Sequence, residues 1–243
     1  MSIYGGPEIV TDGLVFYLDA GNSKSYPGIG STWYDLSGYN NHATLSTTAF
    51  DTDKRGNILF DAAADSAVIT HSSLFNFNSS FTVSAYLRVN ILNLSSIYNI
   101  ISKKASFNNT QKGWSCQLDY RNTGIMHYRN NDGTVLGDST QDSTVNNTSL
   151  LNQTASYKHL VWVLRQSPQN VFFYIDGVLR SGPTAILYTD TDTSNNLYIG
   201  KTVGSGGDNS LFMNLSNLSI YNRTLTASEI AQNYNATKGR FGL

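Results

Sequence analysis

The stretch FTVSAYLRV, residues 81–89, shows the clearest alternation of apolar and polar side chains in the sequence. One set of alternate positions carries Phe81, Val83, Ala85, Leu87 and Val89. The other set carries Thr82, Ser84, Tyr86 and Arg88. A period of two is typical of a β-strand that turns one face toward a hydrophobic core. The stretch therefore predicts a strand in a sheet with one buried face.

Strand patterns of the same kind recur along most of the chain. They lie at 13–20, 57–61, 67–71, 114–120, 125–129, 159–165, 171–180, 196–201 and 211–221. Within 171–180, Asp176 and Gly177 form a strong turn signal, because both central residues of a type I′ hairpin turn need positive φ. About a dozen short strands without a linker or a repeat predict an all-β fold, a single two-sheet antiparallel β-sandwich.

One helix is expected at the end of the chain. The segment Thr226–Glu229 fits a capping box, in which the Thr226 side chain accepts from the Glu229 amide and the Glu229 side chain reaches back. Ile230 and Tyr234 are four residues apart and would share the helical face that packs on the sandwich. Gly239 is expected to end this short helix or to follow it. We therefore divide the chain into an N-terminal arm (1–12), a sandwich (13–235) and a C-terminal tail (236–243), with arm and tail outside the core.

Composition and charge exclude several classes of function. The chain has 243 residues and a net charge of −1, from 16 basic and 17 acidic residues, which argues against a nucleic acid as partner. No apolar run reaches the roughly 18 residues that a membrane span needs. The single cysteine, Cys116, allows no intrachain disulfide and is expected to be a buried thiol. Residues 1–13 lack the pattern of a secretory signal, so we expect synthesis in the cytoplasm.

The sequence offers no catalytic constellation. A retaining glycosidase needs two carboxylates about 5 Å apart. Of the two glutamates, Glu8 lies in the arm and Glu229 is explained as a helix cap. The four histidines are far apart and form no metal-binding motif. We therefore expect a protein that is not an enzyme and that needs no cofactor.

A metal site has weak support. The stretch DTDTSNN, 190–196, resembles the start of a Ca²⁺ loop but lacks the glycine at position 6 and the glutamate at position 12 of an EF-hand. A looser oxygen cage would use Asp190 or Asp192.

A glycan site has better support in the aromatic, Asn-rich region 33–42. Flat rings stack on sugar faces, and neighbouring Asn and Asp side chains bind hydroxyl groups. The candidate residues for a glycan site are Trp33, Tyr34, Asp35, Tyr39, Asn40 and Asn41. Other aromatic side chains in or near loops are Tyr26, Tyr120 and Tyr128. The alternative is that these rings close the end of the sandwich or contact another protein.

Three stretches together resemble one family. They are Gly13–Leu45, with its Trp-x-Asp-x-Ser-Gly turn, the hairpin Phe172–Arg180, and the ending Leu197–Ile230. They are similar to concanavalin A-like, laminin-G-type jelly-roll domains, and the resemblance implies that fold. Acidic residues before the last strand often hold a structural Ca²⁺ in this family. Here Ser216 and Asn217 stand in their place, which weakens a carried-over Ca²⁺ site.

The two ends carry a narrower resemblance. The opening YGGPEIVTDGLVFYLDAGNSKSYPG and the ending NATKGRFGL are similar to concanavalin A-like proteins of tailed bacteriophages, which are regarded as virion components. This resemblance implies a protein that is assembled into a virion in a bacterial cytoplasm, that contacts other virion proteins, and that forms a homo-oligomer. It favours capsid decoration; a tail-fibre or baseplate adhesin for host glycans and a polysaccharide-degrading enzyme are the alternatives.

Overall fold

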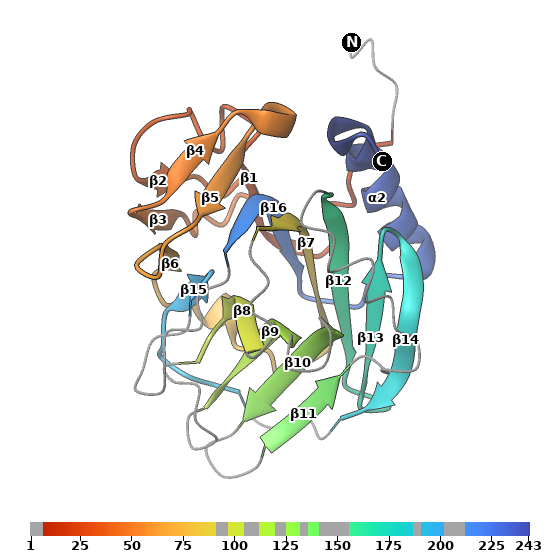
Figure 1. The fold of residues 1–243 in the computed structure, drawn as a ribbon. Helices are drawn as coiled ribbons and strands as arrows, with labels where there is room; N and C mark the ends of the chain where they lie inside the picture. The colour runs from red at the N-terminus through yellow and green to blue at the C-terminus, as the bar shows by residue number, and fades with distance from the viewer. Residues whose placement is uncertain are drawn as a thin grey trace.

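The strands of the computed structural model form two antiparallel sheets that pack face to face (Figure 1). The structure describes residues 7–90, 97–104, 112–119, 125–131, 136–140, 156–186, 191–201 and 212–243. Within these ranges each sheet has eight strands. Two 3₁₀ turns, η1 (Asp53–Arg55) and η2 (Ser73–Phe75), and one helix, α2 (Ala227–Phe241), complete the described elements. The predicted all-β sandwich with a C-terminal helix is confirmed.

The first sheet, sheet A, combines strands from both ends of the chain. Its strand order is β14 (Val178–Ala185), β13 (Asn170–Ile175), β12 (Lys158–Arg165), β7 (Phe81–Val89), β16 (Met213–Tyr221), β5 (Asn57–Phe60) and β4 (Ala49–Asp51), and β1 (Leu14–Asp19) also pairs with β16. The β13–β14 turn has Asp176 at φ 52° and Gly177 at φ 78°, as the Asp-Gly signal predicted.

The second sheet, sheet B, contains the middle strands and two short strands near the start. Its order is β11 (Leu136–Thr140), β10 (Ile125–Asn131), β9 (Gly113–Asp119), β8 (Ile97–Ser102), β15 (Leu197–Ile199), β6 (Ser66–Ile69), β3 (Ala43–Ser46) and β2 (Thr32–Trp33). The hairpin β2–β3 therefore forms one edge of this sheet.

The core lies between the sheets and follows the predicted alternation. From β7 it receives Phe81, Val83, Ala85, Leu87 and Val89, all at most 4% exposed. From β9 it receives Trp114, Cys116 and Leu118. The indole N–H of Trp114 donates to the Phe75 carbonyl at 2.8 Å, so this buried polar group is satisfied. Burial raises the pKa of the Cys116 thiol, consistent with a structural thiol.

The polar face of β7 is also buried at Thr82, Ser84 and Tyr86 and half-buried at Arg88, and α2 covers the outside of sheet A (Figure 1). Ile230 of α2 packs in a second apolar cluster with Val161, Val163 and Tyr221 of the sheet. Nearer the end of the helix, Phe241 stacks on Tyr86 at 4.7 Å between ring centroids. Two-sided burial explains how a strand with four polar positions lies in the middle of the protein.

The helix is longer than the sequence predicted. The capping box of Thr226 and Glu229 is confirmed. The helix then continues through Gly239 to Phe241, and Gly242 caps it in the left-handed conformation at φ 72°. The expectation that residues 236–243 form a tail outside the core is wrong for residues 236–241, because they belong to the helix and Phe241 is buried against Tyr86 of the sheet.

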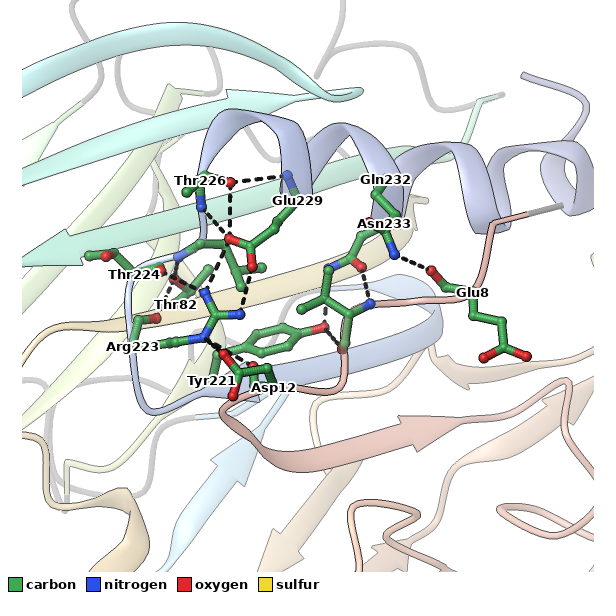
Figure 2. Close-up of polar contacts among 12 residues, drawn as sticks. Glu8, Asp12, Thr82, Tyr221, Arg223, Thr224, Thr226, Glu229, Gln232 and Asn233 are labelled. Carbon is green, nitrogen blue, oxygen red and sulfur yellow. Dashed lines mark hydrogen bonds and ion pairs between the residues drawn. The ribbon is translucent and has the colours of Figure 1, made fainter.

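The N-terminal arm is likewise attached to the helix in its described part, residues 7–12. Figure 2 shows the amide of Gln232 donating to the Glu8 carbonyl at 2.7 Å. The Val10 N–H donates to Asn233 Oδ1 at 2.8 Å, and the Tyr221 hydroxyl donates to the Val10 carbonyl at 3.0 Å. The expectation that this part of the arm lies outside the core is therefore wrong, since Val10 is buried beside Ile230.

Glu229 connects the helix start to the preceding loop (Figure 2). Its carboxylate accepts from Arg223 Nη2 at 2.6 Å and from the Thr226 N–H at 2.8 Å. The hydrogen-bonded Arg223 guanidinium, helped by Thr226, lowers the pKa of Glu229 to about 2. Since an unfolded glutamate titrates near ~4.3, the carboxylate stabilises the fold above that pH, and this contribution is lost as the pH falls through about 2.

We expect Glu229→Gln to lower the free energy of unfolding at neutral pH by about 1 kcal/mol, a value discounted for the partial exposure of the pair. The variant should also lose less stability than the wild type when the pH falls from ~5 to ~2. Urea denaturation across this pH range measures both effects. Glu8→Gln is the control, because the exposed Glu8 contacts Gln232 through its main chain alone. Equal pH dependence in Glu229→Gln and the wild type would contradict the role of the carboxylate.

Candidate functional site

The loop 34–42 between β2 and β3 is held in one conformation by Asp35. One carboxylate oxygen accepts from the N–H groups of Tyr17 and Ser37 at 3.0 and 2.9 Å. The other accepts from the Ser37 hydroxyl at 2.8 Å and from the Asn41 N–H at 3.0 Å. The loop is thus tied both to itself and to β1. An ordered loop loses little entropy when it binds a ligand.

The loop presents two tyrosine rings to solvent. Tyr34 is 42% exposed and Tyr39 is 51% exposed. The His42 ring meets Tyr34 edge-on at 5.1 Å, and His42 Nδ1 accepts from the Asp35 N–H at 3.1 Å, so His42 links Tyr34 to the fixed part of the loop. Asn40 is exposed with φ 59°, and the Asn41 side chain is half-buried.

Two of the predicted glycan-binding residues have structural roles instead. Trp33 is fully buried, because it is the last residue of β2 and faces the core opposite Ala43. Asp35 is 6% exposed and occupied by its four donors. The expectation that the Trp33 ring lies open to a sugar is therefore wrong. Tyr26 and Tyr128 are also buried, and Tyr120 lies outside the described residues.

Two further aspartates, Asp65 and Asp176, accept hydrogen bonds from other groups of the protein. Asp65 accepts from the N–H groups of Asp61 and Ala62, both at 2.8 Å. Asp176 accepts from Lys158 Nζ and from the His159 N–H, both at 3.0 Å. Asp65 thus holds the turn between β5 and β6, and Asp176 joins the β13–β14 turn to the start of β12. Both carboxylates have structural partners.

The described residues contain no group of three or more His, Cys, Asp or Glu side chains that would hold a metal ion. Of the two Ca²⁺ candidates, Asp192 is exposed and Asp190 lies outside the described residues. Within the same ranges, no helix combines the length and apolar character that a membrane crossing requires.

Two of the buried basic side chains, His159 and Lys103, have a lowered pKa, which the sequence does not indicate. His159 lies under α2, where its Nε2 is 2.8 Å from the Ser84 hydroxyl and burial lowers its pKa to about 3. Lys103 at the end of β8 donates to the Asn195 carbonyl at 2.8 Å, and burial lowers its pKa to about 8. Only the three-dimensional neighbours of these residues distinguish them from surface residues. Both are enclosed by protein, which suits packing rather than substrate binding.

An open groove lies between the C-terminal half of α2, η1 and the loop that follows β1. Its volume is about 700 Å³. Asp19, Asn22, Arg55, Asn235, Thr237 and Arg240 are among the residues that line it. No motif in the sequence indicates this groove, because its walls come from segments near residues 20, 55 and 240.

The comparison with protein families agrees with this architecture. Residues 61–231 match the model of the concanavalin A-like lectin/glucanases superfamily. The chain belongs to the concanavalin A-like lectin/glucanase superfamily. This confirms the family resemblance stated from the sequence, and the matched range runs from the end of β5 into α2.

Solved structures similar to this superfamily domain include enzymes and binding domains. The binding domain of Paraclostridial Mosquitocidal Protein 1 aligns with a TM-score of 0.66 and 20% identity over 93% of this chain and 52% of its own. The receptor binding domain of botulinum neurotoxin type G aligns with a TM-score of 0.63 and 17% identity over 92% of this chain and 51% of its own. A mutant of Trypanosoma rangeli sialidase aligns with a TM-score of 0.65 and 18% identity over 98% of this chain and 35% of its own. The chain thus spans a third to a half of the length of these proteins, and at this identity the likeness shows the fold alone. No curated protein matches the sequence.

Proposed function

We propose that this superfamily domain binds carbohydrate through the loop 34–42 and does not act on it chemically. The observation that carries the proposal is the pair of exposed rings, Tyr34 and Tyr39, on a loop that Asp35 fixes. Aromatic rings on ordered loops supply apolar surface at low entropic cost, and the exposed Asn40 amide supplies hydrogen bonds for hydroxyl groups. The similar folds named above, which include toxin binding domains, are consistent with a binding role.

The loop also supports the view that the domain is not a hydrolase. Its only acidic residue is Asp35, and the four donors on Asp35 leave it no lone pair free for a substrate. Hydrolysis of a glycoside by the common mechanism requires two carboxylates that flank the scissile bond. Release of reducing ends from a polysaccharide by the pure protein would contradict this part of the proposal.

We expect Tyr34→Ala and Tyr39→Ala each to weaken binding to a polysaccharide ligand about tenfold, because each loses a stacking ring worth ~1.5 kcal/mol. Tyr34→Phe and Tyr39→Phe keep the rings and should retain most of the affinity. Leu179→Ala is the control, since Leu179 is 45% exposed on β14. Titration by calorimetry, after a glycan array has identified a ligand, measures the effect. Unchanged affinity in the double alanine variant would exclude this loop as the site.

We also propose that this binding module is displayed on a phage particle. A role in capsid decoration is preferred to a position in a tail fibre or baseplate. Its support is the resemblance of the opening and ending segments to phage proteins. In the fold these two segments lie together, because Arg240 of the ending segment forms an ion pair with Asp19 of the opening segment. Such a protein would be made in the bacterial cytoplasm and would contact other virion proteins. Mass spectrometry of purified particles tests the role, and absence of the chain from them would exclude it.

A further inference from the structure

The groove beside the end of α2 is built on a fixed floor. Arg240 forms an ion pair with Asp19, and its Nε and Nη2 donate to the carbonyls of Lys54 and Gly56, both at 2.6 Å. Its guanidinium lies against Gly21, where a Cβ atom would come within 2.3 Å of Arg240 Cζ. The charge of Arg240 is therefore paired with Asp19 and is not available to a ligand. Its role is to join the loop after β1, η1 and α2 into one rigid surface.

Arg55 is the basic residue of the groove that remains available. It is exposed, and among the described residues it has no carboxylate partner. Its backbone lies in the left-handed region at φ 69°, and the preceding Lys54 has φ 50°. Left-handed conformations are uncommon for residues other than glycine and cost free energy that the surrounding structure must supply. The contacts of Arg240 with Lys54 and Gly56 maintain this turn, which places Arg55 in the groove wall.

The charge around the groove is positive although the whole chain is almost neutral. Five of the 16 basic residues line it or lie next to a lining residue, and these are Lys24, Lys54, Arg55, Lys238 and Arg240. Lys238 and Arg240 lie in the last turn of α2, where they offset the partial negative charge of the helix C-terminus. Asp53, the acidic residue of η1, is 3.6 Å from Arg88. Lys24, Lys54 and Arg55 remain to attract an anion.

We propose that this groove binds an acidic sugar unit of a polysaccharide, with Arg55 pairing with the carboxylate or sulfate group. The guanidinium suits both anions because it presents paired donors. Asn22 and Asn235 line the same groove, and side-chain amides suit ring hydroxyls; the Asn22 oxygen accepts from the Lys24 N–H at 3.0 Å, so Asn22 would offer its NH₂ group. Its volume of about 700 Å³ lies within the roughly 300–1,000 Å³ of small-molecule sites. The inference rests on the proposed carbohydrate binding and adds a second contact site and a charge preference to it.

Binding to matched polymers tests the inference. Dextran sulfate is compared with dextran, and polygalacturonate with its methyl ester, so that each pair differs in charge and the two pairs separate sulfate from carboxylate. We expect the wild-type protein to bind at least one acidic polymer more tightly than its neutral counterpart. Arg55→Asn should reduce that affinity about tenfold and leave binding to neutral polymers unchanged. Asparagine is chosen because it tolerates the left-handed backbone.

Arg165→Gln is the matched control, since it removes the same charge from an exposed position on β12. An equal loss of affinity in both variants would indicate general charge attraction and would overturn the inference. So would equal affinity for acidic and neutral polymers in the wild-type protein. If Arg55→Asn weakens binding and the Tyr34 and Tyr39 variants do not, the groove is supported and the loop site is wrong. The reverse result retains the loop and excludes the groove.

Discussion

Ile230→Asp is expected to lower the free energy of unfolding by about 5 kcal/mol, a large part of the total stability of a domain. Ile230 is fully buried where α2 meets the outer face of sheet A. Its neighbours there are Val10, Val161, Val163, Tyr174, Tyr221 and Leu225. The substitution removes the apolar contacts and also buries a carboxylate among apolar side chains. Ile230→Ala, which removes the contacts alone, should cost about 3 kcal/mol.

Urea denaturation followed by circular dichroism measures both variants. Ser228→Asp is the control, because it adds the same charge at an exposed position in the first turn of α2, where a negative charge is favourable. We expect it to change the stability by no more than about 0.5 kcal/mol. If Ile230→Asp were no less stable than Ser228→Asp, the packing of α2 on sheet A would be wrong.

The sequence predicted those parts of the fold that depend on neighbours along the chain. The alternation in 81–89 identified the two faces of β7, the pair Asp176-Gly177 identified a hairpin, and the pair Thr226 and Glu229 identified a helix start. Each of these signals lies within ten residues. The length of α2 was not predicted, because the polar residues and the glycine at 235–240 resemble a tail. What extends the helix is the stacking of Phe241 on Tyr86, a contact between segments far apart in the sequence.

The sequence likewise located only part of the candidate site. The sequence located the loop 34–42, yet it grouped the buried Trp33 with the exposed Tyr34, because β2 has only two residues and shows no alternation. The role of Asp35 as the centre of the loop depends on the N–H of Tyr17 in another strand. The groove was missed entirely. Arg55 is one of 16 basic residues in the sequence, and only the folded chain places it beside Asn22 and Asn235.

Gly56→Ala is expected to cost about 3 kcal/mol, since it combines backbone strain with a steric clash. Gly56 has φ 131° and ψ 135°, a conformation that residues with a side chain rarely adopt. An added Cβ would lie 2.5 Å from the Ala20 carbonyl oxygen, which is main chain and has little freedom to move away. The Gly56 carbonyl accepts from Arg240 Nη2, so a displaced Gly56 would also weaken the joint between η1 and α2.

Gly30→Ala separates the two causes. Gly30 has φ 90°, and an added Cβ there would meet no heavy atom within 4 Å, so we expect the cost of strain alone, about 1 kcal/mol. Thermal and urea denaturation of both variants give the difference that is due to the clash. The proposed groove adds a second expectation: because Arg55 precedes Gly56, Gly56→Ala should weaken binding to an acidic polymer, whereas Gly30→Ala should not. Equal stabilities of the two variants would show that η1 does not pack against Ala20 as closely as the fold described here requires.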